Sequence, residues 1–148
     1  MATAMRKSIY GRQLGIDDNN NIVGSGRASA LIVTAAAGSA NISNVTLQVV
    51  DFEDAPVAGV RNLNVWLSDS TSGIGLTATT ASGTVTATTG TDFFDQVAKK
   101  AKIIQTDATG KIVLAITDTA KTAFKVCYQM SEGGGAKVGV TLATGNYG

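Results

Sequence analysis

Two turn sequences, each set between runs that alternate apolar and polar residues, constrain the fold of this chain more than any other feature. The first spans Asp51 to Val60 and contains Pro56 and Gly59, and the second spans Thr106 to Lys111. Proline cannot donate a hydrogen bond to a sheet and glycine tolerates a positive φ, so the first segment must turn. The alternation on either side of both turns predicts half-buried antiparallel strands. We therefore expect an all-β protein.

Further runs along the chain repeat this pattern. The run 42–50 alternates clearly, and in the run 61–69 Leu63, Val65 and Leu67 share one face while Trp66 points to the other. Later runs of the same kind cover 101–106, 111–117, 123–130 and 137–142. Many short strands at a spacing of roughly ten residues are typical of a sandwich or a barrel. We expect an antiparallel β-sandwich.

Two segments fit the strand pattern less well. Residues 73–91 are dominated by Gly, Ala, Ser and Thr, and we expect an edge hairpin there with Ser82-Gly83 at its tip. In residues 91–102 the positions of Phe93 and Phe94 and of the next apolar residues approximate helical spacing. A short helix and a structured loop fit that segment equally well.

The first 40 residues differ from the rest of the chain. They contain turn-rich and small-residue stretches, such as 17–21 and 35–40, with little hydrophobic periodicity. We therefore expect an extended arm over residues 1–40, with at most one short strand near 30–34, followed by a sandwich domain over residues 41–148. Apolar residues of the arm have no evident local core, and such residues often pack onto a partner.

Seven side chains are the candidates for partner contact. In the arm, basic residues bracket apolar and aromatic ones, and the single tryptophan of the chain lies opposite the core face of its strand. A frayed terminus is the alternative for the arm. For the tryptophan, cover by the same chain is favoured over contact with another subunit. The candidates are Arg6, Lys7, Ile9, Tyr10, Arg12, Leu14 and Trp66.

The composition argues against the commonest kinds of catalysis. The chain has no histidine, so no serine or threonine hydroxyl has an imidazole to take its proton. Asp51, Glu53 and Asp54 lie in one turn with no apolar pocket implied, and we interpret them as solvated turn residues rather than an acid and base pair. We expect no enzyme, no catalytic residues and no cofactor.

A metal site is not expected either. The stretch Asp17-x-Asn19-x-Asn21 starts like an EF-hand loop, but Ile22 and Ala28 stand where that loop requires glycine and glutamate. A polar turn is the better interpretation. Cys127 is the one cysteine and lies in an apolar run, so we expect a buried structural thiol.

Charge and hydropathy argue against two further classes of partner. Lys and Arg number 12 against 11 acidic residues, and a net charge of +1 provides no broad field to attract nucleic acid or anionic lipid. No stretch approaches the roughly 18 apolar residues of a membrane span. Residues 1–13 also lack the pattern of a secretory signal. We expect a soluble protein made in a cytoplasm, with neither nucleic acid nor membrane as its partner.

The two turn sequences also carry a resemblance. Val45 to Ser68 resembles bacterial and phage Ig-like modules, in which a strand ends at an Asp and a Pro-Val-x-Gly-Val turn starts the next strand. Thr106-Asp-Ala-Thr-Gly-Lys111 is similar to the second hairpin of the same modules and follows in the same order. The resemblance covers about residues 42–142. It implies an Ig-like antiparallel β-sandwich, here preceded by the N-terminal arm.

The opening of the chain carries a narrower resemblance. Arg6-Lys-Ser-Ile-Tyr-Gly-Arg-Gln-Leu-Gly15, ahead of one Ig-like domain, is similar to the head decoration, or capsid cement, proteins of tailed bacteriophages. This resemblance implies a structural virion protein that binds the outer surface of the capsid and strengthens the head against internal DNA pressure. The implied partners are the major capsid protein and further copies of this chain, with a trimer as the expected homo-oligomer. Residues 73–91 and the Phe93-Phe94 segment match no part of this pattern.

A related role is the main alternative. A tail-associated or fibre Ig-like domain has the same turn sequences, but it binds host cell-surface glycans and has no affinity for heads. A bacterial surface adhesin fits less well, because no export signal is recognised. The resemblance to decoration proteins implies that the protein lies on the outer surface of a virion capsid.

Overall fold

The computed structural model describes residues 4–7, 13–16, 22–23, 27–131 and 134–148, and their regular structure is almost entirely β. Three short strands precede the main domain, β1 (Ala4–Lys7), β2 (Gln13–Ile16) and β3 (Ile22–Val23). The main domain contains β4 (Ala30–Ala37), β5 (Ile42–Val50), β6 (Asn62–Ser68), β7 (Val85–Thr89), β8 (Thr91–Val97), β9 (Ala101–Gln105), β10 (Lys111–Thr117), β11 (Lys125–Met130), β12 (Lys137–Thr141) and the 3-10 helix η1 (Thr144–Asn146).

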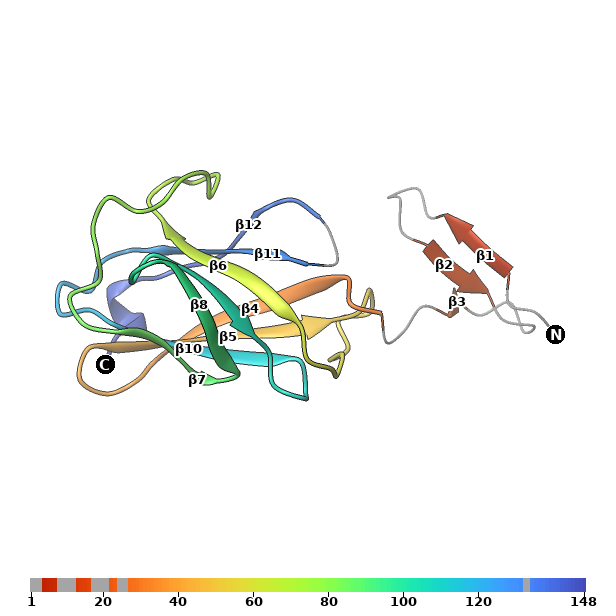
Figure 1. Cartoon of the computed structure of the whole chain (residues 1–148), viewed down its shortest axis with the longest axis horizontal. Coiled ribbons are helices and arrows are strands. Elements are labelled where there is room, and N and C mark those ends of the chain that lie inside the picture. The colour runs from red at the N-terminus through yellow and green to blue at the C-terminus, as the bar shows by residue number, and fades with distance from the viewer. Residues whose placement is uncertain (1–3, 8–12, 17–21, 24–26, 132–133) are drawn as a thin grey trace.

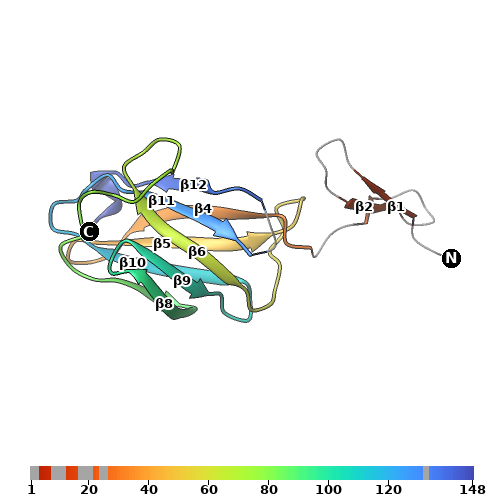
Figure 2. The same ribbon diagram turned by 45° about the horizontal axis from the view of Figure 1, so that its top comes forward.

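Two antiparallel sheets pack face to face in this domain, which confirms the predicted all-β sandwich (Figures 1 and 2). One sheet has the order β4-β5-β10-β7, and the other has the order β12-β11-β6-β9-β8. The core between them is built by the alternating apolar positions of the sequence, because every second residue of β5 and of β6 is buried. Leu47, Leu63, Ile112 and Phe124 are among its fully buried side chains.

The strand order is that of an Ig-like domain except for the two strands that extend the second sheet. An Ig domain places strands A, B, E and D in one sheet and G, F and C in the other. Here β4-β5-β10-β7 and β12-β11-β6 occupy those positions, and β9 and β8 extend the second sheet as C′ and C″ do in variable-type domains. In this chain, however, β8 and β9 follow the D-position strand β7 rather than precede it. In antibody domains a tryptophan packs against a disulfide between the two sheets. This chain cannot form such a disulfide, because Cys127 is its only cysteine.

The two turn sequences that predicted the fold pack against each other at one end of the sandwich. The Gly59 N–H donates to the Ala108 carbonyl at 2.9 Å, and the Val49 N–H donates to the Gly110 carbonyl at 2.9 Å. Gly59 and Gly110 both have positive φ, at 117° and 78°. The Asp51 carboxylate accepts the N–H groups of Glu53 and Ala55, so it shapes the first turn. The two motifs therefore form one structural unit.

The boundary between arm and domain requires a correction. The predicted arm over residues 1–40 includes β4, but β4 pairs with β5 along its whole length and Leu31 lies in the core. The alternation of β4 is weak because small residues fill 35–37. The described part of the sandwich thus begins near Arg27 rather than at residue 41.

The predictions for residues 73–102 are wrong in two places. Residues 76–80 form no strand, so no hairpin has Ser82-Gly83 at its tip; only β7 is a strand, at the edge of its sheet as expected. The Gly83 N–H instead donates to the Thr117 carbonyl at 2.9 Å. Residues 91–97 are neither helix nor loop but the edge strand β8.

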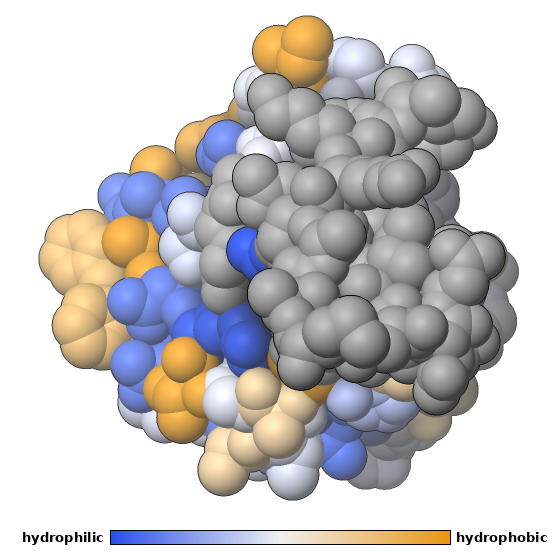
Figure 3. Space-filling model, turned by 90° about the vertical axis from the view of Figure 1, so that its right-hand side faces the viewer, coloured by the Kyte–Doolittle hydropathy of each residue, from blue (hydrophilic) through white to orange (hydrophobic). Residues whose placement is uncertain are grey.

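The N-terminal strands form a separate small sheet. β2 pairs with β1 on one side and with β3 on the other, and none of the three pairs with a described strand of the sandwich. This sheet lies beyond the end of the sandwich from which β4 starts (Figures 1 and 2). On the visible sandwich surface around it, hydrophobic and hydrophilic residues are interspersed (Figure 3).

The last residues of the chain are anchored on the sandwich. Tyr147 is buried and its hydroxyl donates to the Thr122 carbonyl at 2.7 Å. Burial, with a smaller contribution from the negative charge of Asp118, raises the pKa of Tyr147 to about 12, so the phenol stays neutral. The Asn41 N–H donates to the carbonyl of Gly148, which fixes the end of the chain at the β4–β5 turn.

Candidate functional site

The candidate contact residues lie in two different parts of the structure. Arg6 and Lys7 belong to β1 and Leu14 to β2, and the backbone register pairs Arg6 directly with Leu14. Trp66 belongs to β6 in the sandwich. The remaining candidates, Ile9, Tyr10 and Arg12, lie outside the described residues, as does the Asp17-x-Asn19-x-Asn21 turn.

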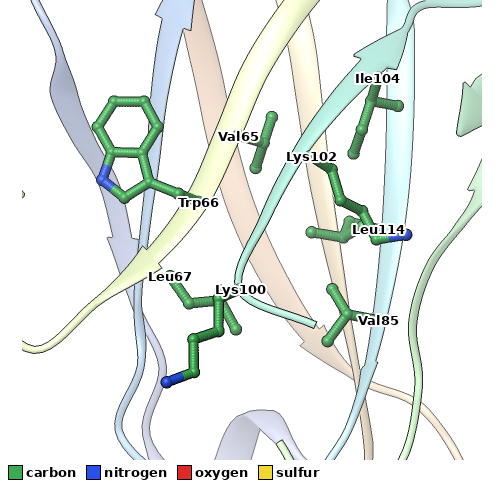
Figure 4. A pocket seen from close by; sticks show the side chains of 8 residues that line it. All are labelled: Val65, Trp66, Leu67, Val85, Lys100, Lys102, Ile104 and Leu114. Carbon is green, nitrogen blue, oxygen red and sulfur yellow. The ribbon is translucent and has the colours of Figure 1, made fainter. Parts of the chain in front are cut away.

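Trp66 lies on the outer face of the five-stranded sheet and is half-buried there. Its register partners are Cys127 on β11 and Ala101 on β9, both buried. The indole N–H donates to the Gly73 carbonyl at 2.9 Å, so the loop that follows β6 covers part of the ring. Figure 4 shows the indole pointing away from the core residues around it. The chain's own loop therefore provides some of the cover for Trp66.

The covering loop, residues 69–78, is held in place by one carboxylate. Asp69 accepts hydrogen bonds from the Thr77 hydroxyl and from the Ala78 N–H, both at 2.7 Å. The Ala78 N–H, followed by the Thr77 hydroxyl, lowers the pKa of Asp69 below its usual value of 3.8. Lys100 donates to the carbonyls of Thr77 and Ala78 from the turn between β8 and β9. The loop is thereby tied to the β8 side of the sheet.

The largest group of exposed apolar side chains surrounds this loop and β8. Of the seven large hydrophobic side chains that are exposed among the described residues, five belong to the loop or to β8. Phe93 is 65% exposed and Phe94 59%. We call this surface the β8 patch; its exposed members are Ile74, Leu76, Phe93, Phe94 and Val97, with Trp66 and Ile103 half-buried beside them.

The backbone register explains which of these side chains share a face. Phe94 pairs with Ile103, and Val97 pairs with Ala101, the neighbour of Trp66. Directly opposite residues of antiparallel strands point to the same side of a sheet. Phe94, Val97 and Ile103 therefore lie on the outer face with Trp66. The residue that sequence reasoning singled out is thus at the border of a larger patch that it did not predict.

Amide side chains form the next part of the same outer face. Asn62 and Gln105 are register partners, and the Gln105 amide donates to the Asn62 side-chain oxygen at 3.2 Å. Asn64 pairs with Ile103 on one side and with Gln129 on the other. Apolar and amide residues thus share the outer face of β6, β9 and β8, and on β11 that face carries Gln129, the buried Cys127 and Lys125.

The charged residues of β8 point the other way. Asp92 pairs with Ile104 and Asp95 with Lys102, on the side that faces the sandwich interior. The Lys102 ammonium lies 2.7 Å from the Asp95 carboxylate and 3.5 Å from that of Asp92, with only 7% of the lysine side chain exposed. The ion pairs hold β8 to β9 and leave the outer face of these two strands uncharged.

A small apolar gap between the sheets is lined by core residues such as Val65, Ile104 and Leu114, with the stem of Lys102 beside them (Figure 4). Burial raises the pKa of the Cys127 thiol, and this cysteine is fully buried as predicted. Within the described ranges no group of three His, Cys, Asp or Glu residues is placed to hold a metal ion. No helix in that part of the chain is long and apolar enough to cross a membrane.

No family model matches this chain, and no curated protein matches it.

Proposed function

We propose that this protein is a structural virion protein that binds the outer surface of a tailed-phage capsid and stabilises the head shell as a decoration protein. The proposal rests on the resemblance of residues 6–15 to such proteins. The observation that supports it best is the N-terminal sheet, whose described strands pair with one another and not with the sandwich. A segment of this kind is available to bind a second surface while the sandwich remains folded.

The mechanism needs binding energy rather than an active site. The N-terminal segment carries Arg6, Lys7 and Arg12 and no acidic residue before Asp17, so it suits an acidic or apolar groove between capsid subunits. Each copy adds a modest buried area, and the symmetry of the shell multiplies it over many equivalent sites. The major capsid protein is the partner of this proposal, with further copies of the chain as neighbours on the shell.

Binding to purified heads tests this proposal. The full chain and a variant lacking residues 1–26 are mixed with expanded heads of the phage that encodes the protein, and the heads are sedimented. We expect the full chain to sediment with the heads and the truncated chain to stay in the supernatant. An unchanged circular dichroism spectrum and melting temperature of the truncated chain serve as the control that its sandwich is still folded.

Two outcomes contradict the proposal. Equal sedimentation of the two proteins shows that the N-terminal segment is not the attachment site. Absence of the full chain from the heads, combined with binding to host glycans, supports the tail or fibre role instead.

A further inference from the structure

The β8 patch is large enough to serve as an interface. Its two phenylalanines and three aliphatic side chains leave on the order of 500 Å² of apolar surface exposed, the range in which the largest patch of a monomer is often functional. The other two exposed large hydrophobic side chains of the described residues, Ile32 and Val60, lie outside β8 and its covering loop. Most of the exposed large hydrophobic side chains of the described residues therefore belong to β8 and the covering loop.

The edge of β8 is not suited to pairing with another strand. The register to β9 shifts twice, between Asp92 and Phe94 and between Asp95 and Val97. Bulges twist an edge strand away from further pairing, and charged residues on the strand oppose it as well. A partner is therefore expected on the outer face of the sheet rather than along its edge.

The outer face selects an uncharged partner. At the positions of β6, β9 and β8 that point outward, every residue is apolar or neutral polar. Of the charged groups around this face, Asp69 and Lys100 are engaged with residues 77–78, Lys125 on β11 donates to the Asp69 carbonyl, and Lys99 lies in the turn after β8. Because the charged groups lie at the border of this face and not within it, the centre of the face favours a neutral partner.

Such a surface is complementary to itself. The amides of Asn62, Asn64, Gln105 and Gln129 each carry donors and an acceptor, so two identical amide rows can satisfy each other when a twofold axis relates them. Apolar side chains such as Phe94 and Ile103 match a second copy equally well. We propose that two copies of this chain associate face to face through the β8 patch and the neighbouring amides.

The size of the surface sets the expected strength. A stable interface buries roughly 800 Å² per partner, and the β8 patch with its amides provides somewhat less. We therefore expect reversible dimers with a Kd of roughly 10 to 100 µM. This contact is independent of the capsid proposal, and it is distinct from the trimer that the resemblance implies, because a face-to-face contact joins only two copies.

Analytical ultracentrifugation of the full chain between 1 µM and 1 mM tests the contact. We expect a shift from one to two chain masses, and Phe94→Asp should weaken the association at least tenfold. Ile32→Asp is the matched control, because Ile32 is 42% exposed on the outer face of the other sheet. Both side chains are exposed, so the melting temperatures of the two variants should stay close to that of the native chain.

Cysteine cross-linking locates the contact. Ile103→Cys places a half-buried cysteine on the outer face of β9, next to the edge strand β8. Val113→Cys is the matched variant on the other sheet, because Val113 is half-buried on the outer face of β10, next to the edge strand β7. On oxidation at 200 µM we expect a disulfide dimer from Ile103→Cys and little from Val113→Cys, with the buried Cys127 unreactive. A single chain mass at all concentrations overturns the proposal. So does a dimer or trimer that Phe94→Asp leaves unchanged, or equal cross-linking of the two cysteine variants.

Discussion

At the scale of single residues, the two turn sequences depend on each other. Gly110 has a φ of 78° and lies so close to the first turn that an added Cβ clashes with the Val57 carbonyl. The Gln48 side chain also donates to the carbonyls of Thr109 and Gly110. The sequence predicts each turn separately, because Pro, Gly and Asp have local effects on the backbone. Their mutual contact is tertiary and has no signature in either motif.

Substitution at Gly110 measures this contact. Gly110→Ala is expected to destabilise the fold by at least about 3 kcal/mol, because it combines left-handed strain with a backbone clash. Gly75→Ala is the control, since Gly75 also has a positive φ but has no atom within 4 Å of the added Cβ. We expect that control to cost about 1 kcal/mol. Urea denaturation gives both values, and equal losses show that the contact with Val57 is unimportant.

Three carboxylates determine the expected response to acid. The Thr109 hydroxyl and then the Lys111 N–H lower the pKa of Asp107. For Asp118 burial alone raises the pKa, but hydrogen bonds from Thr122 and Ser82 outweigh it and the net shift is downward. Asp69 has a lowered pKa as well. Because the folded pKa values lie below the unfolded ones, the folded state binds fewer protons at acidic pH.

The stabilisation from these carboxylates is complete above the unfolded pKa, near pH 4, and is lost as the pH falls through the lowered folded pKa values. We expect the melting temperature to be flat from pH 7 to 5 and to fall steadily below about pH 4. Asp107→Asn should lower the melting temperature at pH 7 and flatten the acid decline. A melting temperature that is constant down to pH 2.5 contradicts this assignment.

At the scale of elements, the strands that alternate strictly were predictable and β8 was not. Two bulges place Thr91, Phe94 and Val97 on one face and Asp92 and Asp95 on the other. The spacing within each face is then three residues, which resembles a helix rather than a strand. The three-residue spacing in the sequence is therefore real, but it arises from two bulges in an edge strand and not from a helix. The exposed aromatic pair was missed for the same reason.

The loop before β7 was misread for a different reason. Residues 76–80 are rich in threonine, which favours strands. The structure instead uses their polar groups locally, with Thr77 and Ala78 bound to Asp69. Local hydrogen bonds of this kind compete with the hydrogen bonds of a β-sheet, and the residue pattern alone does not show which set forms.

The corrected domain boundary predicts different outcomes for two truncations. Removal of residues 1–26 spares β4 and should leave the melting temperature within about 2 °C of the full chain. Removal of residues 1–40 deletes β4, with its pairing to β5 and the buried Leu31, and should cost more than about 3 kcal/mol or prevent folding. Thermal denaturation separates the cases. Equal stability of the two truncated chains shows that β4 is not an integral part of the sandwich.

At the scale of the whole molecule, the chain combines a β-sandwich that has its own core with two features that do not contribute to that core. One is the N-terminal sheet, which pairs with no described strand of the domain. The other is the β8 patch on the outer face of the five-stranded sheet. The sequence predicted an N-terminal segment outside the core but not its pairing into a sheet, and it indicated the second feature only through Trp66. We propose that the first feature binds the capsid and, independently, that the second binds another copy of the chain.

Cryo-electron microscopy of the phage particle proposed to carry this protein tests the proposed role most directly. The account predicts a map in which the Ig-like sandwich stands on the outer surface of the head, with density for residues 1–26 lying along the joints between capsid subunits. A map that places the sandwich on the tail or its fibres, or that shows it on the head with residues 1–26 turned away from the shell, contradicts the account.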